Sequence, residues 1–231
     1  SANTDGSTVS ATGGGGVPTP TYNLDFRQVS STSITDSIGG LTATDNGSMS
    51  STVSDGATFD GTDDYISFSP YIDATSGFSL EFYFYQTSTS GIVYLIDLAH
   101  DTTYYTSTAD NVLIRTASGS NSLGYTVREG TSNMTTGSQT FGGWTHCVIT
   151  TNNSGNVTFY IDGSQVYSTS NMPRTIVSGT RSSSVIGGSA QYAYTQTTSS
   201  FFTSEALFNG KVKYLRTVSY THLRAHETPC H

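Results

Sequence analysis

The sequence predicts an all-β protein, folded as a sandwich of two antiparallel sheets. The 231 residues include 15 Tyr and 11 Phe, which favour strands, whereas strong helix formers such as Lys and Glu are scarce. About a dozen short apolar or aromatic segments are separated by polar turns. Phe78, Leu80, Phe82 and Phe84 alternate along one segment, so we expect all four to face the core. No apolar run reaches the roughly 18 residues of a transmembrane helix.

Each expected strand is a short run of β-branched, aromatic or aliphatic residues between turn-forming residues. The clearest pair is 144–150 and 157–161, joined by a Gly-bearing loop at 152–155. Asp162 and Gly163 then form a two-residue turn into the next strand. In chain order, the expected strands are 22–27, 57–60, 65–69, 78–85, 92–98, 112–115, 123–128, 144–150, 157–161, 166–167, 185–186 and 207–215.

The domain is expected to span residues 21–217, between two segments of different composition. Residues 1–20 are rich in Gly, Ser and Thr and are typical of a flexible linker. Residues 218–231 resemble the translation of a sequencing-library adapter and are expected to be non-native. For this reason we do not interpret His222, His226, Cys230 and His231 as a metal site, although their residue types suit zinc. Cys147 then remains alone, so no disulfide is expected.

Four motifs, in order, resemble laminin-G-like domains of the concanavalin A-like lectin and glucanase type. The resemblance covers about residues 22–216 and implies a jelly-roll sandwich. This fold carries lectins, glycan-binding modules, adhesins, virion proteins and hydrolases, so it does not by itself define a function. The matching segments are ATFDGTDDYI at 57–66 with FSLEF at 78–82, WTHCVIT at 144–150 with GNVTFYIDG at 155–163, IGG at 186–188, and FNGKV at 208–212.

The signature residues have structural interpretations that we favour over functional ones. We expect Asp60, Gly61, Asp63 and Asp64 to build a tight turn between strands rather than a pair of reacting carboxylates. Trp144 is expected to be half-buried packing, with a sugar platform as the alternative. Cys147 is expected to lie in the core, with His146 on the opposite face of the same strand.

The charge of the chain limits the partners that it can bind. With 17 acidic and nine basic residues the formal net charge is −8, which disfavours nucleic acid. Most of the Asp residues are expected to serve turns. Asp97, Asp101 and Asp110 could instead hold Ca²⁺ around the loop at 99–111, as in some relatives; no other cofactor is expected.

The sequence argues against an enzyme. Glycoside hydrolases of this fold place carboxylates at alternate positions of one strand, so that two of them lie about 5–5.5 Å apart. Glu81, Glu129 and Glu205 each lack an acidic residue two positions away. A hydrolase of the same fold is therefore the least favoured hypothesis for the function of the chain.

Aromatic residues in two polar loops are the candidate ligand-binding residues. Tyr suits sugar recognition because it presents an apolar ring and a polar hydroxyl. We expect a non-catalytic carbohydrate-binding or adhesion module of a larger extracellular or phage structural protein, with a glycan or cell-surface polysaccharide as partner and no membrane insertion. The alternative is a structural spacer of a virion or adhesin protein, in which these residues only cover sheet edges. The candidates are Tyr104, Tyr105, Tyr192 and Tyr194.

Overall fold

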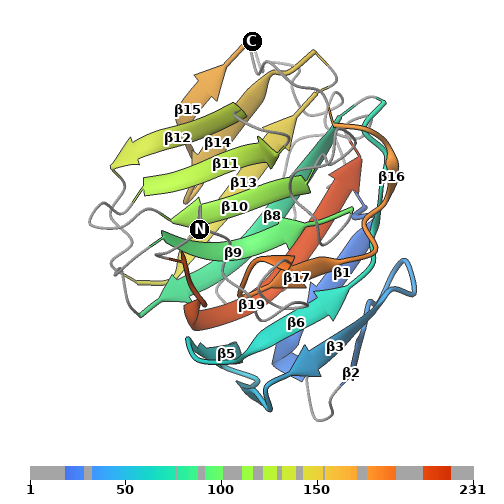
Figure 1. The fold of residues 1–231 in the computed structure, drawn as a ribbon, viewed down its shortest axis with the longest axis vertical. Helices are drawn as coiled ribbons and strands as arrows, with labels where there is room; N and C mark the ends of the chain where they lie inside the picture. Colours follow the sequence, from blue (N-terminus) through green and yellow to red (C-terminus); the bar gives the residue numbers. More distant parts are fainter. Residues whose placement is uncertain are drawn as a thin grey trace, which may run out of the picture.

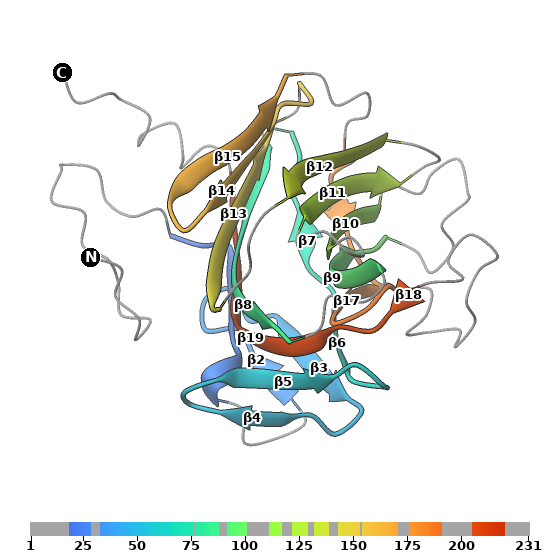
Figure 2. The ribbon, with the colours of Figure 1, turned by 90° about the vertical axis from the view of Figure 1, so that its left-hand side faces the viewer.

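The chain folds into two β-sheets that pack face to face (Figures 1 and 2). The computed structural model describes residues 19–28, 33–75, 77–87, 92–100, 111–116, 122–128, 132–138, 143–152, 154–170, 176–190 and 205–219. Strands account for almost all of their regular structure, together with one short 3-10 helix, η1 (Phe26–Gln28). The all-β prediction is confirmed.

Sheet I contains the predicted hairpin of strands near 144–150 and 157–161. Strand β19 (Asn209–Ser219) pairs with β8 (Phe78–Gln86) on one side. On its other side, its first part pairs with β5 (Gly56–Asp60) and its later part with β1 (Tyr22–Asp25). The order along the sheet is β15 (Ser164–Thr169), β14 (Val157–Ile161), β13 (Thr145–Thr151), β8 (Phe78–Gln86), β19 (Asn209–Ser219), β5 (Gly56–Asp60) and β4 (Ser50–Thr52), with β1 (Tyr22–Asp25) paired to β19.

Sheet II covers the other side of the core, and a two-stranded ribbon of β16 (Gly179–Thr180) and β7 (Tyr71–Ile72) lies apart from it. In sheet II, β18 (Glu205–Ala206) pairs in parallel with β9 (Ile92–Leu98), whereas the other pairings among the described strands are antiparallel. The order along the sheet is β12 (Ser132–Ser138), β11 (Ser122–Arg128), β10 (Asn111–Thr116), β9 (Ile92–Leu98), β17 (Ser184–Ile186), β6 (Tyr65–Phe68), β3 (Thr42–Asn46) and β2 (Ser33–Thr35).

The core lies between the sheets, as the alternation along β8 predicts. Leu80, Phe82 and Phe84 are each 0% exposed. Phe159 of β14 contacts Tyr125 of β11 edge to face, with ring centroids 6.4 Å apart, so this aromatic pair joins the two sheets. Cys147 is completely buried in the same cluster, and burial raises the pKa of its thiol well above the usual value. A thiol in this state acts as a small apolar side chain.

The hairpin turns follow the predicted chemistry. Strands β13 and β14 pair across the loop that contains Gly155. Asp162 and Gly163 have φ angles of 50° and 80° and join β14 to β15. Two successive positive φ angles define the turn that matches the twist of a tight hairpin, for which Asp-Gly is a preferred pair.

Most strand boundaries differ from the prediction by one or two residues, and the last strand differs by more. The first strand was expected to reach Arg27 but ends at Asp25, because the Asp25 carboxylate accepts a hydrogen bond from the Arg27 backbone N–H and the chain turns into η1. The last strand was expected at 207–215 but runs from Asn209 to Ser219. Val218 and Ser219 pair with Ser79 and Phe78 of β8. Strand pairing uses backbone groups, so it can extend through residues of any origin.

Candidate functional site

The outer face of sheet I, which points away from the core, gathers aromatic and charged side chains from three neighbouring strands. Glu81 and Tyr83 alternate with the core residues of β8. His146 of β13 and Tyr214 of β19 lie directly opposite Tyr83, and Arg216 lies opposite Glu81. Side chains at opposed positions of adjacent strands lie within contact distance on the same face. Residues far apart in the sequence therefore form one surface.

A β-bulge in β19 adds a cation to this surface. Val212 pairs with Phe84 and Tyr214 pairs with Tyr83, so Lys213 is an extra residue with no Cα partner on β8. Such an insertion re-aims the side chains around it. Here Tyr214 stands opposite Tyr83, and the Lys213 ammonium nitrogen lies 4.2 Å from the ring centroid of Trp144 and 5.1 Å from that of Tyr83.

Gly56 of β5 allows the bulge to pack against its neighbour. Its φ is +71°, in the left-handed region, and a Cβ at this position would clash with the carbonyl oxygen of Val212 and lie 2.7 Å from the Cα of Lys213. A residue without a side chain fits both constraints. The bulge therefore depends on a glycine in a strand that contributes no side chain to the aromatic surface.

Four half-buried rings make up what we call the aromatic face. They are in mutual contact, with centroid separations of 5.1 Å for Tyr83–Trp144, 6.0 Å for Tyr83–Tyr214 and 5.9 Å for Tyr85–Trp144. Trp144 lies outside the core cluster. The prediction that it is half buried is confirmed, but its contacts are with outer-face tyrosines. The aromatic face consists of Tyr83, Tyr85, Trp144 and Tyr214.

Glu81 is a fixed negative charge beside the aromatic face. Its Oε1 lies 3.0 Å from Nε2 of His146 and accepts hydrogen bonds from the Tyr214 hydroxyl at 3.3 Å and from Nη1 of Arg216 at 3.4 Å. Burial alone would raise the pKa of Glu81, but the contacts with His146 and Arg216 outweigh it and hold the pKa below the usual value. Burial, followed by the charge of Glu81, raises the pKa of Tyr214, so its hydroxyl stays a donor.

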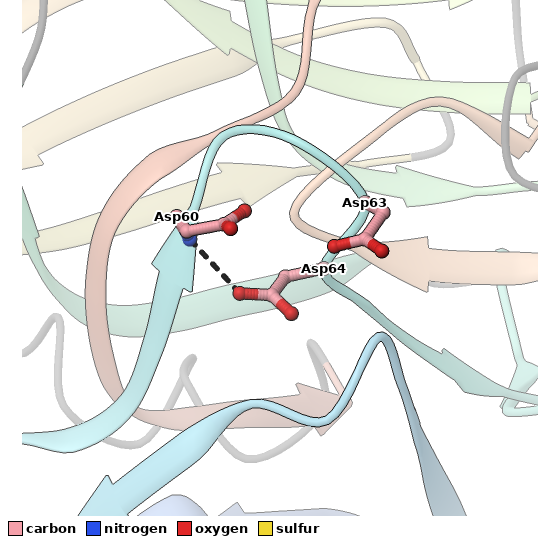
Figure 3. Close-up of side chains that lie close together, drawn as sticks. All are labelled: Asp60, Asp63 and Asp64. Carbon is pink, nitrogen blue, oxygen red and sulfur yellow. Dashed lines mark hydrogen bonds between the residues drawn. The ribbon is translucent and has the colours of Figure 1, made fainter.

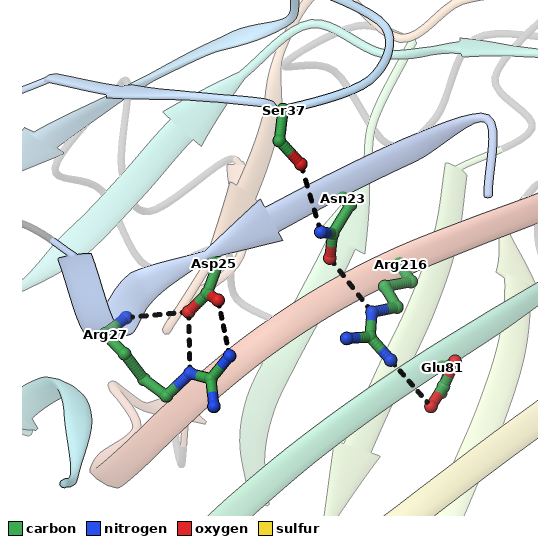
Figure 4. Close-up of polar contacts among 6 residues, drawn as sticks. All are labelled: Asn23, Asp25, Arg27, Ser37, Glu81 and Arg216. Carbon is green, nitrogen blue, oxygen red and sulfur yellow. Dashed lines mark hydrogen bonds and ion pairs between the residues drawn. The ribbon is translucent and has the colours of Figure 1, made fainter. Parts of the chain in front are cut away.

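The network continues from Glu81 to the first strand (Figure 4). Arg216 also donates through Nε to Oδ1 of Asn23, and Asn23 donates to the Ser37 hydroxyl at the far end of the network. Arg27 and Asp25 form a second ion pair on the same side of the sheet. These contacts fix the orientation of Arg216 from two sides.

The position of Glu81 gives a pH prediction. Because its pKa is lower in the folded protein than the ordinary value of 4.5, Glu81 contributes stability above that pH, and this contribution is lost as the pH falls through the lowered pKa. We therefore expect Glu81→Gln to lose stability less steeply than the parent chain between about pH 5 and about pH 3, measured by urea unfolding. Tyr214→Phe, which keeps the Glu81 charge, should retain most of the steep acid dependence. Parallel curves for Glu81→Gln and the parent would contradict the assignment.

A second cluster of polar side chains lies at the turn between β5 and β6 (Figure 3). Carboxylate oxygens of Asp60, Asp63 and Asp64 lie within 4.8 Å of one another. Asp64 accepts a hydrogen bond from the Asp60 backbone N–H at 2.9 Å, and Asp60 accepts one from the backbone N–H of Thr62 at 2.7 Å. Gly61 has a φ of +81°. The predicted tight turn is confirmed. Oxygen ligands of this kind are also those that Ca²⁺ prefers.

The residues expected to bind ligands lie mostly outside the described part of the chain. This holds for Tyr104, Tyr105, Tyr192 and Tyr194, and for Asp101 and Asp110. Asp97 lies in β9, where its side chain is fully buried and accepts a hydrogen bond from the Ala190 backbone N–H at 2.8 Å. The Tyr loop site and the calcium site remain predictions.

The sequence placed two parts of the aromatic face correctly without combining them. The alternation along β8 puts Tyr83 and Tyr85 away from the core, and His146 was expected on the solvent side of β13, where the structure has it. The contribution of β19 was missed, because a bulge gives no signal in the sequence of one strand.

The part of the chain that the structure describes holds no helix of the length and apolar character needed to span a membrane.

A laminin-G family model, described as the concanavalin A-like lectin/glucanases superfamily, matches residues 60–216. The chain belongs to this superfamily, and the predicted concanavalin A-like jelly roll is confirmed. None of the curated proteins compared with the chain matches it.

Three solved structures illustrate the range of proteins with this fold. Domain 4 of AbnA, a GH43 extracellular arabinanase from Geobacillus stearothermophilus, in complex with arabinotriose, is 17% identical with a TM-score of 0.60, over 87% of this chain and 93% of that domain. Trypanosoma rangeli sialidase in complex with sialic acid is 14% identical with a TM-score of 0.62, over 94% of this chain and 34% of the sialidase. The binding domain of botulinum neurotoxin DC in complex with SialylT is 14% identical with a TM-score of 0.59, over 87% of this chain and 48% of that domain.

At these identities the likeness shows the fold alone. The chain spans about a third of the sialidase and about half of the toxin domain. Because the set includes enzymes as well as a toxin binding domain, the shared fold is compatible with both classes of function.

Proposed function

We propose that the chain is a non-catalytic carbohydrate-binding module and that the aromatic face of sheet I carries the binding site. The observation that supports this most directly is the contact of four half-buried aromatic rings with fixed polar groups at their border. Amphipathic rings offer apolar surface to the C–H faces of a sugar at low entropic cost. Oriented side chains beside them supply the few polar contacts that give a site its specificity.

The comparisons support this class of ligand. The arabinanase domain was solved with arabinotriose and the toxin domain with SialylT, both on a fold that the chain shares. These ligands belong to those proteins, and the proposal takes from them only that the scaffold is used for carbohydrate recognition. The acidic net charge of −8 disfavours a nucleic acid as the alternative partner.

The environment of Glu81 supports a function in binding rather than catalysis. A glycoside hydrolase needs a carboxylic acid with a raised pKa opposite a second carboxylate. Glu81 has the opposite property, since contacts with His146 and Arg216 hold its pKa below the usual value and keep it charged. A carboxylate in this state serves to orient Arg216 and Tyr214, not to protonate a leaving group.

We further propose that the module works outside the cell or on a virion, as part of a larger adhesion or phage structural protein. The AbnA domain supports a location outside the cell, because it is one domain of an extracellular enzyme and the chain covers 93% of it. The Gly/Ser/Thr-rich segment at 1–20 supports attachment to a neighbour through a linker.

The test is glycan-array binding of the chain, followed by titration of the best ligand against Trp144→Ala. We expect this variant to weaken binding by about 1–3 kcal/mol, the range of a central aromatic contact, with the fold unchanged by circular dichroism. Tyr71→Ala is the matched control, because Tyr71 is 51% exposed on β7, outside the aromatic face, and its loss should leave affinity unchanged.

The other outcomes separate the alternatives. If Trp144→Ala binds normally but Tyr104→Ala with Tyr105→Ala, or Tyr192→Ala with Tyr194→Ala, does not, then the loops hold the site and its assignment to the aromatic face is wrong. If the parent chain binds no glycan, the result favours the structural-spacer alternative.

A further inference from the structure

The few basic residues of this acidic chain are concentrated around the aromatic face. Four of the nine Lys and Arg residues lie on or beside it: Arg27, Lys211, Lys213 and Arg216. These residues lie close enough to affect one another. Burial lowers the pKa of Lys213, and Arg27 adds to this effect. Burial alone would raise the pKa of Asp25, but hydrogen bonds with Arg27 outweigh it and lower that pKa, and Arg216 adds to the lowering. The basic residues of a chain with a net charge of −8 are thus concentrated at the proposed site.

Three of these four cations have carboxylate partners in the described part of the chain. Arg27 pairs with Asp25, Lys211 with Asp55 at 2.7 Å, and Arg216 with Glu81 at 3.4 Å.

Lys213 differs from the other three. Within the ranges that the structure describes, no carboxylate lies within ion-pair distance of its ammonium group, which rests instead on the rings of Trp144 and Tyr83. Burial lowers the pKa of Lys213, with Arg27 acting in the same direction and Asp55 against it. Lys213 is therefore a partly desolvated cation positioned on the sugar-stacking surface.

On the basis of the carbohydrate-binding function proposed above, we propose that the ligand is an acidic sugar, whose carboxylate pairs with Lys213 while its ring stacks on Trp144 and Tyr83. The Lys213 ammonium lies on ring surface that a stacked sugar would use, so binding displaces it. A neutral sugar offers the displaced ammonium no ion pair to replace its lost cation–π contacts. A sugar that carries a carboxylate replaces those contacts with an ion pair in a partly desolvated site, where an ion pair is stronger than in open water.

The carboxylates near this site are held by other groups of the protein. Burial, followed by the charge of Asp162, raises the pKa of Tyr83, and Asp162 accepts a hydrogen bond from the His146 backbone N–H at 3.0 Å. Glu81 would repel an anion, but its charge is compensated by Arg216 and by hydrogen bonds from His146 and Tyr214. Asp55 forms an ion pair with Lys211, and Asp25 forms one with Arg27. Lys213 projects from a bulge on a flexible stem, so its ammonium can move from the ring face to the ring edge, where the substituents of a stacked sugar lie.

The experiment compares carboxylated glycans with matched neutral ones. The probes are sialyllactose against lactose, and oligogalacturonate against its methyl ester, titrated by calorimetry at low and at physiological salt. We expect one carboxylated probe to bind at least about tenfold more tightly than its neutral counterpart, with a smaller preference at higher salt.

Lys213→Met tests the residue assignment, because Met keeps apolar contact with Trp144 but has no charge. We expect it to abolish the preference for the carboxylated probe. Lys211→Met is the matched control, since Lys211 already pairs with Asp55, and it should keep the preference. Thermal unfolding of both variants shows whether either loses binding because it no longer folds.

Each result has a defined meaning. Binding that depends on Trp144 but is equal for carboxylated and neutral probes, or a preference that survives Lys213→Met, overturns this inference and leaves the proposed function standing. If no glycan binds, acidic or neutral, the proposed function fails and this inference fails with it.

Discussion

Replacing Phe82 by alanine is expected to lower the free energy of unfolding by about 3–5 kcal/mol, the usual range for removing a buried aromatic side chain. Phe82 is 0% exposed and packs between Cys147 of β13 and Leu215 of β19 at the centre of sheet I. Urea unfolding of the variant measures this loss. Because most domains are stable by only about 5–15 kcal/mol, the variant should be close to its unfolding limit.

Phe159→Ala should have a similar effect for a different reason. Phe159 joins the sheets through its edge-to-face contact with Tyr125. It also packs against Tyr167, with the two ring centroids 5.7 Å apart. Val53→Ala is the surface control, because Val53 is 81% exposed, and it should change stability by less than about 0.5 kcal/mol. If either Phe variant unfolds within roughly 1 kcal/mol of the parent, the assignment of that residue to the core is wrong.

Gly56→Ala is expected to destabilise the protein by about 2–5 kcal/mol, the sum of a left-handed backbone strain of about 1–2 kcal/mol and an overpacking cost of about 1–3 kcal/mol. The added Cβ would press on Val212 and Lys213, the residues that form the bulge of β19. Because the bulge positions Lys213 and Tyr214, we also expect glycan binding to weaken, although Gly56 itself has no side chain to offer a ligand.

Gly40→Ala separates the two causes. Gly40 has the same φ of +71° as Gly56, but a Cβ there would have no neighbour within 4 Å. This variant therefore carries only the backbone strain and should lose about 1–2 kcal/mol, with binding unchanged. Equal losses for Gly40→Ala and Gly56→Ala, measured by urea unfolding, would show that the contact with the bulge costs nothing.

Most strands in the middle of each sheet could be predicted from the sequence, whereas several strands at or beside the edges could not. Strand β9 was predicted to the residue, because a strand buried on the core side must carry apolar residues. Strands β2, β4 and β12 lie at sheet edges, and β3 lies beside β2. Their sequences are SIT, SST, SNMTTGS and TATDN, which contain too little apolar character to distinguish them from loops. An edge strand is held mainly by backbone hydrogen bonds, which leave no trace in composition.

The aromatic face shows where reading one strand at a time fails. The positions of Tyr83 and His146 relative to the core follow from alternation within single strands. Their contact with Tyr214 and Lys213 depends on which strand borders β8 and on one inserted residue in β19. Pairing register depends on two segments that are distant in the sequence. The residues of the aromatic face therefore come from separate segments, and each of them on its own resembles an ordinary solvent-facing position of a strand.

The pairing of the first strand with the last also determines how the domain would respond to tension. Tyr22 lies opposite Thr217, and the pairing runs antiparallel to Asp25 and Tyr214, so the two ends of the described domain leave the sheet side by side. A force that pulls the two flanking segments apart then breaks the backbone hydrogen bonds between β1 and β19 one after another, starting at Tyr22 and Thr217, instead of loading all of them at once. Beyond that ladder, β19 remains held by β8 along almost its whole length. Stretching would therefore detach β1 first, while the strands that carry the aromatic face stay in place.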